Sequence, residues 1–284
     1  MSQSSTTRQV DIPGEVFNLR AFQDRDLDAA QALSSRLGWP HRREDWATSL
    51  AIGEGLAIED ARGRLIGTGF CFNQGRIATM GLVIIDDDWQ RRGLGREMMT
   101  RLMGLAGERT QLLVATEAGA PLYIKLGFSP CNTIHQYQGR VTATVAVPDM
   151  PGLRALHDSD LEPITAMAPL NPVHVNTVLQ ADDGVVIEEN GRLVGVALRR
   201  LYGRGDHVGP IMAQTPEQAR AMMAFLLSRA YGRFVRLDLV EPEDDQLLLA
   251  AGLACVNRIE RMRRGPEVPG SPLTRFGLIN QALG

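Results

Sequence analysis

Cysteine is scarce in this chain of 284 residues, where only Cys71, Cys131 and Cys255 occur. Their number is odd, they lie far apart, and no Cys-x-x-Cys pair or Cys/His cluster accompanies them. Neither a disulfide framework nor a zinc site is therefore indicated. We expect three buried free thiols and no metal.

An excess of basic charge is also lacking. The formal net charge is -3 and charged residues make up 22% of the chain. Proteins that bind nucleic acid by its phosphates usually carry a basic field or stripe. Nucleic acid is therefore not expected as a partner.

The chain contains no uninterrupted apolar run of about 18 residues, the length that a membrane helix requires. Its first eight residues, MSQSSTTR, are polar and have no apolar signal core. These absences predict no membrane partner and a cytoplasmic location. Hydrophobic residues nevertheless reach 44%, which suits well-packed cores. The length exceeds the ~100–200 residues of one typical domain, so we expect two.

The most informative segment is 90–95, with sequence QRRGLG, between an apolar run at 81–85 and a helix-like run at 96–106. Glycines at a helix start let backbone N–H groups approach an anion, which the helix dipole also favours. A Walker-type loop would end in Gly-Lys-Ser/Thr, but Arg96 follows here. A dinucleotide fingerprint would need a small residue at Met98 and an acidic residue about 20 positions on. A pyrophosphate ligand fits the segment better.

Segment 90–95 resembles the Gln/Arg-x-x-Gly-x-Gly/Ala signature with which the GNAT superfamily of N-acetyltransferases holds the pyrophosphate of acetyl-coenzyme A. A second segment, 120–128, resembles the last conserved helix and turn of that superfamily, which carries a tyrosine four residues before a Gly-Phe pair. Here these residues are Tyr123, Gly127 and Phe128. The resemblance implies an α/β fold with a mixed central sheet flanked by helices.

The chain also repeats itself. Residues 19–27, LRAFQDRDL, recur as LRALHDSDL at 153–161, with six of nine positions identical. Further on, the segments 55–67 and 184–195 both read as strand, tight turn and strand, with glycine at the turn. Such internal repeats indicate duplicated units. We predict two tandem GNAT-like domains.

The predicted organisation is a disordered tail at 1–14, an N-terminal domain at 15–146, a degenerate copy at 147–265 and an arm at 266–284 that packs back on the protein. The meander and crossover helices of each copy are typical of an α/β fold. In the first copy we expect strands at 16–20, 55–60, 64–73, 76–85, 111–115 and 133–142, and helices at 25–37, 43–51, 93–106 and 120–126.

The second copy departs from the motif where the glycine turn should stand. Residues 213–220, AQTPEQAR, contain no glycine. Thr215 is a good N-cap, Pro216 suits the first helical position, and Gln218 can close a capping box. The position matching Tyr123 carries Leu248. We therefore expect coenzyme binding only in the first copy, with the second copy shaping the fold or the substrate site, or else holding a small effector.

The resemblance assigns acetyl-coenzyme A as co-substrate. A backbone N–H near the end of the strand 76–85 could polarise the thioester carbonyl as an oxyanion-type donor. The arginines of the turn would add positive charge, unless they form a solvated surface cluster. The predicted coenzyme contacts are Val83, Ile84, Ile85, Gln90, Arg91, Arg92, Gly93, Leu94, Gly95 and Arg96.

Tyr123 matches the tyrosine that protonates the coenzyme A thiolate in the superfamily. A phenol of pKa ~10 can protonate a thiolate whose acid has a pKa near ~8.5 only if the local field helps. The alternative is a tyrosine that packs under the turn at Gly127. Glu117 is the candidate base, through a water relay, or else a solvated loop residue.

Other polar residues near these segments are weaker candidates. The acidic run 86–88 is expected at a turn. The region where the superfamily usually builds substrate specificity contains Trp39, His41, Glu44 and Trp46.

Two functions remain open. One is transfer of an acetyl group to a primary amine of a small molecule or amino-acid-like substrate, directly in a ternary complex, by a monomer or homodimer. The other is a non-catalytic acyl-CoA-binding sensor or regulatory module. The turn at 90–95 serves both, whereas Tyr123 favours the enzyme.

Overall fold

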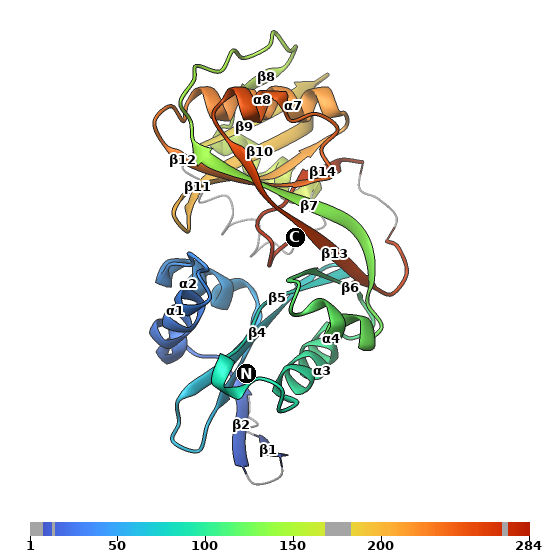
Figure 1. Ribbon diagram of the computed structural model, residues 1–284. Helices are drawn as coiled ribbons and strands as arrows, with labels where there is room; N and C mark the ends of the chain where they lie inside the picture. Colours follow the sequence, from blue (N-terminus) through green and yellow to red (C-terminus); the bar gives the residue numbers. More distant parts are fainter. Residues whose placement is uncertain (1–7, 13–14, 168–182, 269–271) are drawn as a thin grey trace.

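The computed structural model describes residues 8–12, 15–167, 183–268 and 272–284. Fourteen strands of these residues form one mixed sheet in the order β1-β2-β3-β4-β5-β6-β13-β7-β12-β14-β11-β10-β9-β8. Figure 1 shows two halves, one for each copy, joined by the long strands β7 and β13. The α/β class and the duplication are both confirmed.

The first copy contains the helices and strands that the sequence predicts, within a few residues. Its α3 packs on β3, β4 and β5, whereas α1 packs on α2 and β4. The bounds are β1 (Arg8–Ile12), β2 (Glu15–Ala21), η1 (Asp24–Asp26), α1 (Leu27–Arg36), α2 (Arg43–Ile52), β3 (Glu54–Glu59), β4 (Leu65–Gln74), β5 (Ile77–Ile85), η2 (Asp87–Trp89), α3 (Leu94–Ala106), β6 (Thr110–Ala115), α4 (Ala120–Lys125) and β7 (Ser129–Arg140).

The second copy repeats this order. Its α7 packs on β9, β10 and β11, as α3 does on the first sheet. The bounds are β8 (Leu153–Ala155), η3 (Asp158–Asp160), α5 (Leu161–Met167), β9 (Asp183–Glu189), β10 (Arg192–Tyr202), β11 (Gly205–Ala213), α7 (Pro216–Ser228), β12 (Phe234–Val240), α8 (Gln246–Ala250), β13 (Ala254–Arg264) and β14 (Thr274–Gly277).

The repeated LRA segments build the same ion-pair cluster twice. In the first copy, Arg20 binds Asp26 through two hydrogen bonds of 2.7 Å and also contacts Glu59. In the second, Arg154 contacts Asp160 and Glu188 in the same way, at 2.7–2.8 Å and 2.7 Å. The matching hairpin turns carry Gly63 and Gly191, with φ of 76° and 73°. Duplication thus extends from sequence to side-chain contacts.

The last strands of the two copies are exchanged. β13, from the second copy, pairs with β6 of the first, while β7, from the first copy, pairs with β12 of the second. The two exchanged strands also pair with each other. Each half of the sheet is therefore completed by a strand from the other copy. The predicted boundary between residues 146 and 147 divides the sequence but does not separate the two halves in space. The domain bounds themselves stay a prediction.

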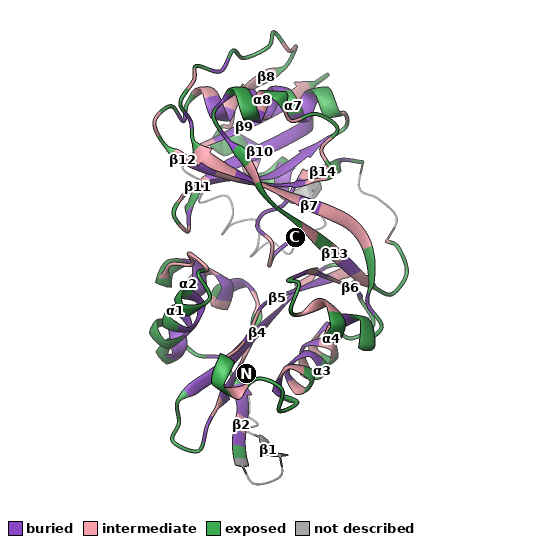
Figure 2. Ribbon diagram, viewed as in Figure 1, coloured by how far each residue is buried: buried purple, intermediate pink, exposed green. Residues whose placement is uncertain are grey.

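Three apolar cores hold the molecule together. One lies between α3 and the first half of the sheet, and one lies under α7 in the second. The third joins the halves, since it combines Trp46 and Phe70 with Val196, Ile279 and Leu283. Figure 2 shows the inner strands as buried and the outer helix faces as exposed.

The chain ends differ from each other. A disordered tail over 1–14 was predicted, but residues 8–12 form β1 and pair with β2; residues 1–7, 13 and 14 lie outside the described residues. In the arm 266–284, β14 pairs with β11 and β12, and the segment after it packs against the first copy. There, Leu283 O accepts hydrogen bonds from Gln74 Nε2 at 2.5 Å and Thr79 Oγ1 at 3.2 Å.

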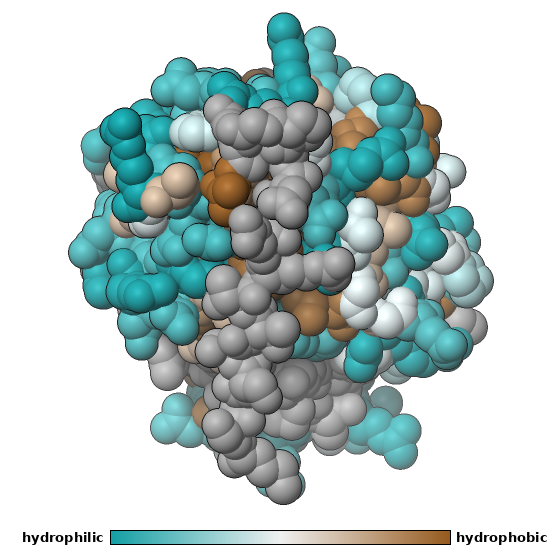
Figure 3. Space-filling model, turned by 90° about the horizontal axis from the view of Figure 1, so that it is seen from below, coloured by the Kyte–Doolittle hydropathy of each residue, from teal (hydrophilic) through white to brown (hydrophobic). Residues whose placement is uncertain are grey.

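The three cysteines are free, as predicted, but only Cys71 is buried; Cys131 and Cys255 keep partial exposure. Within the described ranges, no group of three or more His, Cys, Asp or Glu side chains is arranged to hold a metal ion. No helix of those ranges is long and apolar enough to cross a bilayer. Figure 3 shows the lower face, where hydrophilic residues dominate and apolar ones form small separate patches.

Candidate functional site

The turn before α3 has the backbone of an anion-binding loop. Gly93 caps the helix with φ 84°, and Arg91 has φ 61°. Positive φ strains a non-glycine residue by about 1–2 kcal/mol, and such strain concentrates at functional sites. Alternating left-handed and right-handed residues point successive N–H groups to one side, which makes a concave anion site.

The first N–H groups of α3 are left open. The first helical hydrogen bond runs from Glu97 N to Gly93 O, at 3.1 Å, so the N–H groups of residues 94–96 precede it. Gly93 offers no side chain to cap them, and these three groups have no partner among the described residues. A Cβ on Gly93 would meet nothing within 4 Å. The helix therefore presents N–H groups and its positive dipole end to open space.

The strand β5 opens an edge toward this turn. Its pairing with β6 ends at Met80, while residues 81–85 continue beyond it. Asp86 N donates to Ile66 O on β4 at 2.8 Å. Because N–H groups alternate sides along a strand, those of Ile85 and Val83 face the other, open edge. A bulge with Leu82 at φ 54° marks the point of divergence.

The open edge of β5 and the turn before α3, residues 90–95, meet at α4. A Cβ on Gly95 would lie 3.4 Å from Leu122 Cδ2 and 3.9 Å from Ile85 Cγ1, so these three elements converge. Gln90 Nε2 donates to Ile85 O at 3.2 Å and further ties the turn to the strand. The structure thus brings together the strand edge, the turn and the helix that carries Tyr123.

Tyr123 is buried and its ring is fixed. It packs edge-on to Phe128 at 6.2 Å, and a Cβ on Gly119 would lie 2.8 Å from its Cε2. Its hydroxyl has no hydrogen-bond partner among the described residues. Burial raises the pKa of Tyr123 to about 12. The phenol therefore stays protonated, as a proton donor must.

Of the other predicted site residues, Ile84 and Leu94 are buried, whereas the charged ones lie at the surface. Arg91 and Arg96 are exposed, and Arg92 lies 4.8 Å from the ring of Trp89. Glu117 is exposed in the turn before α4 and contacts no other described side chain through a hydrogen bond or ion pair. Its role as base stays a prediction.

The second copy closes the corresponding helix end, as the sequence predicts. Thr215 Oγ1 accepts from Gln218 N at 3.3 Å, and Gln218 Oε1 accepts from Gln214 N at 3.0 Å and Thr215 N at 3.3 Å. Pro216 removes another N–H donor. Leu248, at the position of Tyr123, is buried in the core. At this helix end Gln218 N is capped, Pro216 has no N–H, and Leu248 supplies no phenol.

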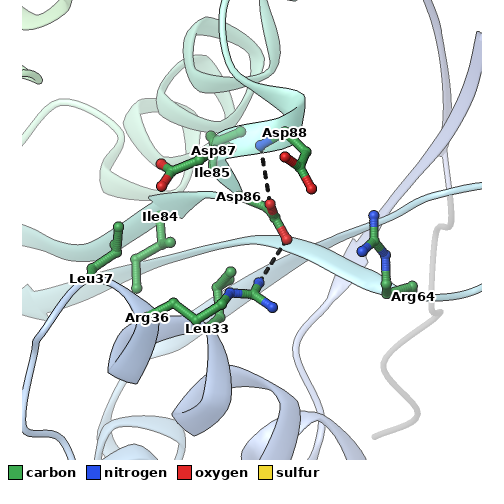
Figure 4. Close-up of a pocket in the computed structure, with 9 residues that line it drawn as sticks. All are labelled: Leu33, Arg36, Leu37, Arg64, Ile84, Ile85, Asp86, Asp87 and Asp88. Atoms are coloured by element: carbon green, nitrogen blue, oxygen red, sulfur yellow. Dashed lines mark hydrogen bonds and ion pairs between the residues drawn. The ribbon is translucent and has the colours of Figure 1, made fainter.

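A cavity of about 210 Å³ lies beside the turn on the α1 side of the sheet (Figure 4). The predicted acidic turn forms one wall: Asp86 caps η2 through Asp88 N at 3.2 Å and pairs with Arg36 at 2.7 Å. Its lining is Leu33, Arg36, Leu37, Arg64, Ile84, Ile85, Asp86, Asp87 and Asp88. Arg36 and Asp86 are thus already paired with each other.

The expected specificity region docks on the second copy. His41 Nδ1 lies 2.9 Å from Tyr202 Oη, Asp45 Oδ2 accepts from Gly203 N at 3.0 Å, and Arg42 donates to Leu201 O. Trp46, which the sequence offered only as a weak candidate, is fully buried and stacks on Phe22 at 5.9 Å. The hairpin between β10 and β11 of the second copy thus packs against the segment 41–45 of the first copy.

Sequence reasoning missed the residues that the second copy brings to this region. Tyr202, His207 and Asp238 lie more than 150 residues from His41 and carry no local motif. His207 Nε2 and Asp238 Oδ2 are 3.1 Å apart and fully buried. Only the packing of the two copies places these groups together.

This interface predicts a pH dependence of stability. Burial lowers the pKa values of His41 and His207 to about 4, from about 6.5 when unfolded. As the pH falls, these histidines therefore bind protons in the unfolded chain before they do so in the folded one. The unfolding free energy falls between about pH 6.5 and pH 4, by up to about 3 kcal/mol for each histidine. Urea unfolding at pH 7.5 and 4.5 measures this loss. His207→Gln should show a smaller loss than the wild type, and an equal loss would contradict the assignment.

The geometry defines a class of protein: an α/β acyltransferase fold with an uncapped helix start at Gly93 beside the unpaired end of strand β5. Two family models, each described as "Acetyltransferase (GNAT) domain", match the chain, one at residues 53–130 and the other at residues 175–277. The chain is 26% identical to "Uncharacterized N-acetyltransferase YitH" of Bacillus subtilis (strain 168) over 239 residues, 81% of this chain and 83% of the relative.

Solved structures share the fold. A putative acetyltransferase from Pyrococcus horikoshii has a TM-score of 0.77 and 20% identity, covering 99% of this chain and 100% of that one. A GCN5-related N-acetyltransferase from Sphaerobacter thermophilus has a TM-score of 0.63 and 17% identity, covering 91% and 99%. This chain belongs to the GNAT acetyltransferases as a tandem protein with two GNAT domains.

Proposed function

We propose that the first copy transfers an acetyl group from acetyl-coenzyme A to a primary amine in a ternary complex. The observation that carries this proposal is the open N-terminus of α3, with Gly93 at φ 84°, next to the unpaired edge of β5. The family to which the chain belongs supports acyl-CoA-dependent acetyl transfer in general.

The residues of the turn fit a pyrophosphate. The N–H groups of residues 94–96 bond to none of the described residues, the dipole of α3 favours an anion, and Arg91 and Arg96 add positive charge from the surface. Bound there, acetyl-coenzyme A supplies the activated acyl group as a thioester. Val83 N–H faces the open edge and would donate to the thioester oxygen.

Tyr123 would donate the proton that the departing thiolate needs. Because burial holds its pKa near 12, the phenol is a weak acid, and it donates only where the developing thiolate is more basic than in water. The same apolar surroundings that raise the pKa of Tyr123 would also raise the pKa of a thiol bound beside it, so burial widens the gap between the two pKa values less than it raises either. Glu117 is our candidate for accepting the amine proton through water.

Calorimetric titration with acetyl-coenzyme A tests the coenzyme assignment. We expect one site for each chain, because α7 in the second copy caps itself through Thr215 and Gln218. Two equal sites would show that the second copy also binds the coenzyme. An absence of binding would contradict the proposal.

A further inference from the structure

The segment 278–284, which follows β14, packs on the strand β5 that carries the candidate donor to the thioester. Gly81, two residues before Val83, lies directly against Ala282: a Cβ on Gly81 would clash with Ala282 Cβ and lie only 2.6 Å from Ala282 Cα. Two backbones come this close only where one residue has no side chain. Ala282 therefore leaves no space above Gly81.

Hydrogen bonds to both copies hold the segment 278–284 in this position. Leu283 O accepts from two side chains at the ends of β4 and β5. Within the segment, Asn280 Oδ1 accepts from Ala282 N and Leu283 N, each at 2.9 Å. Gln281 Nε2 donates to a carboxylate oxygen on β12 at 3.0 Å. The position of Ala282 over β5 is therefore fixed by its neighbours on both sides.

Apolar clusters flank the unpaired stretch of β5, residues 81–85. On one face, Leu82 is buried in the cluster that joins the two copies, and Ala282 packs against that cluster. On the other face, Val83 packs against the cluster under α3. A charged group placed between such walls would lose its hydration without gaining a partner. This stretch therefore suits an uncharged alkyl chain.

The unpaired stretch of β5 is also closed at its far end. In the proposed complex the coenzyme comes from the turn 90–95, so an acyl group bound at Val83 points back along β5 toward Gly81. There β5 rejoins β6, since Met80 pairs with Leu113 and is buried. Met80 precedes Val83 by three residues, which is about 10 Å of strand at ~3.3 Å per residue. An acyl chain is therefore confined between Val83 and this pairing, beside Ala282.

We infer that Ala282, packed on Gly81, limits the acyl group of the coenzyme to a short uncharged chain, so that acetyl fits and butyryl does not. This inference rests on the proposed function and names the residue that sets its acyl specificity. Ala282 belongs to the segment that follows the second copy. The limit on the acyl group is therefore set from outside the copy that binds the coenzyme.

Steady-state kinetics with one responsive amine and with acetyl- or butyryl-coenzyme A tests the inference. In the wild type we expect kcat/KM to be at least tenfold lower for butyryl-coenzyme A, because a methylene group that a closed site cannot hold costs about tenfold or more. Ala282→Gly removes the methyl group that lies against Gly81 and should reduce this preference to about threefold or less. Equal kcat/KM values for the two donors in the wild type, or an unchanged preference in Ala282→Gly, would overturn the inference.

Ala213→Gly is the matched control. Ala213 is fully buried on β11 in the cluster under α7, so this variant loses the same methyl group in the other half of the sheet. It should keep the acyl preference of the wild type. An equal loss of preference in both variants would mean that a general loosening of the fold explains the effect, and would also overturn the inference. Where Ala282→Gly does not fold, as judged by circular dichroism, the wild-type preference alone decides.

Direct binding separates this inference from the proposed function. If no amine is acetylated, calorimetric titration of acetyl- and butyryl-coenzyme A into the chain still compares the two acyl groups. A Kd at least tenfold higher for butyryl-coenzyme A in the wild type, and about threefold or less in Ala282→Gly, supports the limit even where the acetyl-transfer proposal fails. Equal Kd values for the two donors, with tight binding of both, would refute the limit alone.

Discussion

Gly93→Asp is expected to weaken acetyl-coenzyme A binding by at least a hundredfold, about 3 kcal/mol. Gly93 has φ 84°, so any side chain strains the turn by about 1–2 kcal/mol. The carboxylate would also stand beside the open N–H groups of α3 and repel the pyrophosphate. Calorimetric titration of the wild type and the variant measures the difference.

Gly191→Asp is the control for this prediction. Gly191 has φ 73° at the β9–β10 turn of the second copy, and its Cβ would also meet nothing within 4 Å. The variant therefore carries the same backbone strain and the same added charge away from the coenzyme turn. It should bind acetyl-coenzyme A like the wild type. Equal losses in both variants would mean that strain or misfolding, rather than the anion site, explains the effect.

Tyr123→Phe is expected to lower kcat at least tenfold, about 1.4 kcal/mol or more, and to leave coenzyme affinity nearly unchanged. The substitution keeps the ring against Gly119 and Phe128 and removes only the hydroxyl that would protonate the thiolate. Steady-state kinetics with a responsive amine, together with coenzyme titration, separates the two effects. Lower affinity with unchanged kcat at saturation would make Tyr123 a packing residue.

Tyr137→Phe serves as the comparison for Tyr123. Tyr137 is buried, and its hydroxyl donates to Asp245 Oδ2 at 2.9 Å on the side of the second copy. Loss of this bond should cost about 1 kcal/mol of stability without lowering kcat. In the wild type, Tyr123 stays protonated up to about pH 11, since its pKa is raised to about 12. Any fall of kcat between pH 8 and 10 must then come from another group.

The parts of the site that were predicted from the sequence depend on local chemistry. Gly93 marks an uncapped helix start because only glycine takes φ near 84° without strain. The capping box of Thr215 and Gln218 is equally local, and the structure contains it. Tyr123 and the turn are found together because the strand, turn and helix between them follow one another along the chain.

The parts that were not predicted depend on contacts between distant segments. The sequence predicts a last strand at 133–142 but not which half of the sheet it completes, so the exchange between copies could not be foreseen. The same exchange brings Arg261, on β13, next to the first copy. The spacing of residues along the sequence does not indicate this contact. The burial of Trp46 was not predicted for a related reason, since its contacts with Phe22 and Phe70 arise only when α2 packs on the sheet.

Amine-dependent release of coenzyme A thiol, followed by mass spectrometry of the amine, tests the central claim most directly. We expect thiol to appear in step with acetylated amine in the wild type, and both rates to fall together in Gly93→Asp. Thiol release that is slow and indifferent to every amine, from a chain that binds one acetyl-coenzyme A tightly, would contradict the enzyme and support an acyl-CoA sensor.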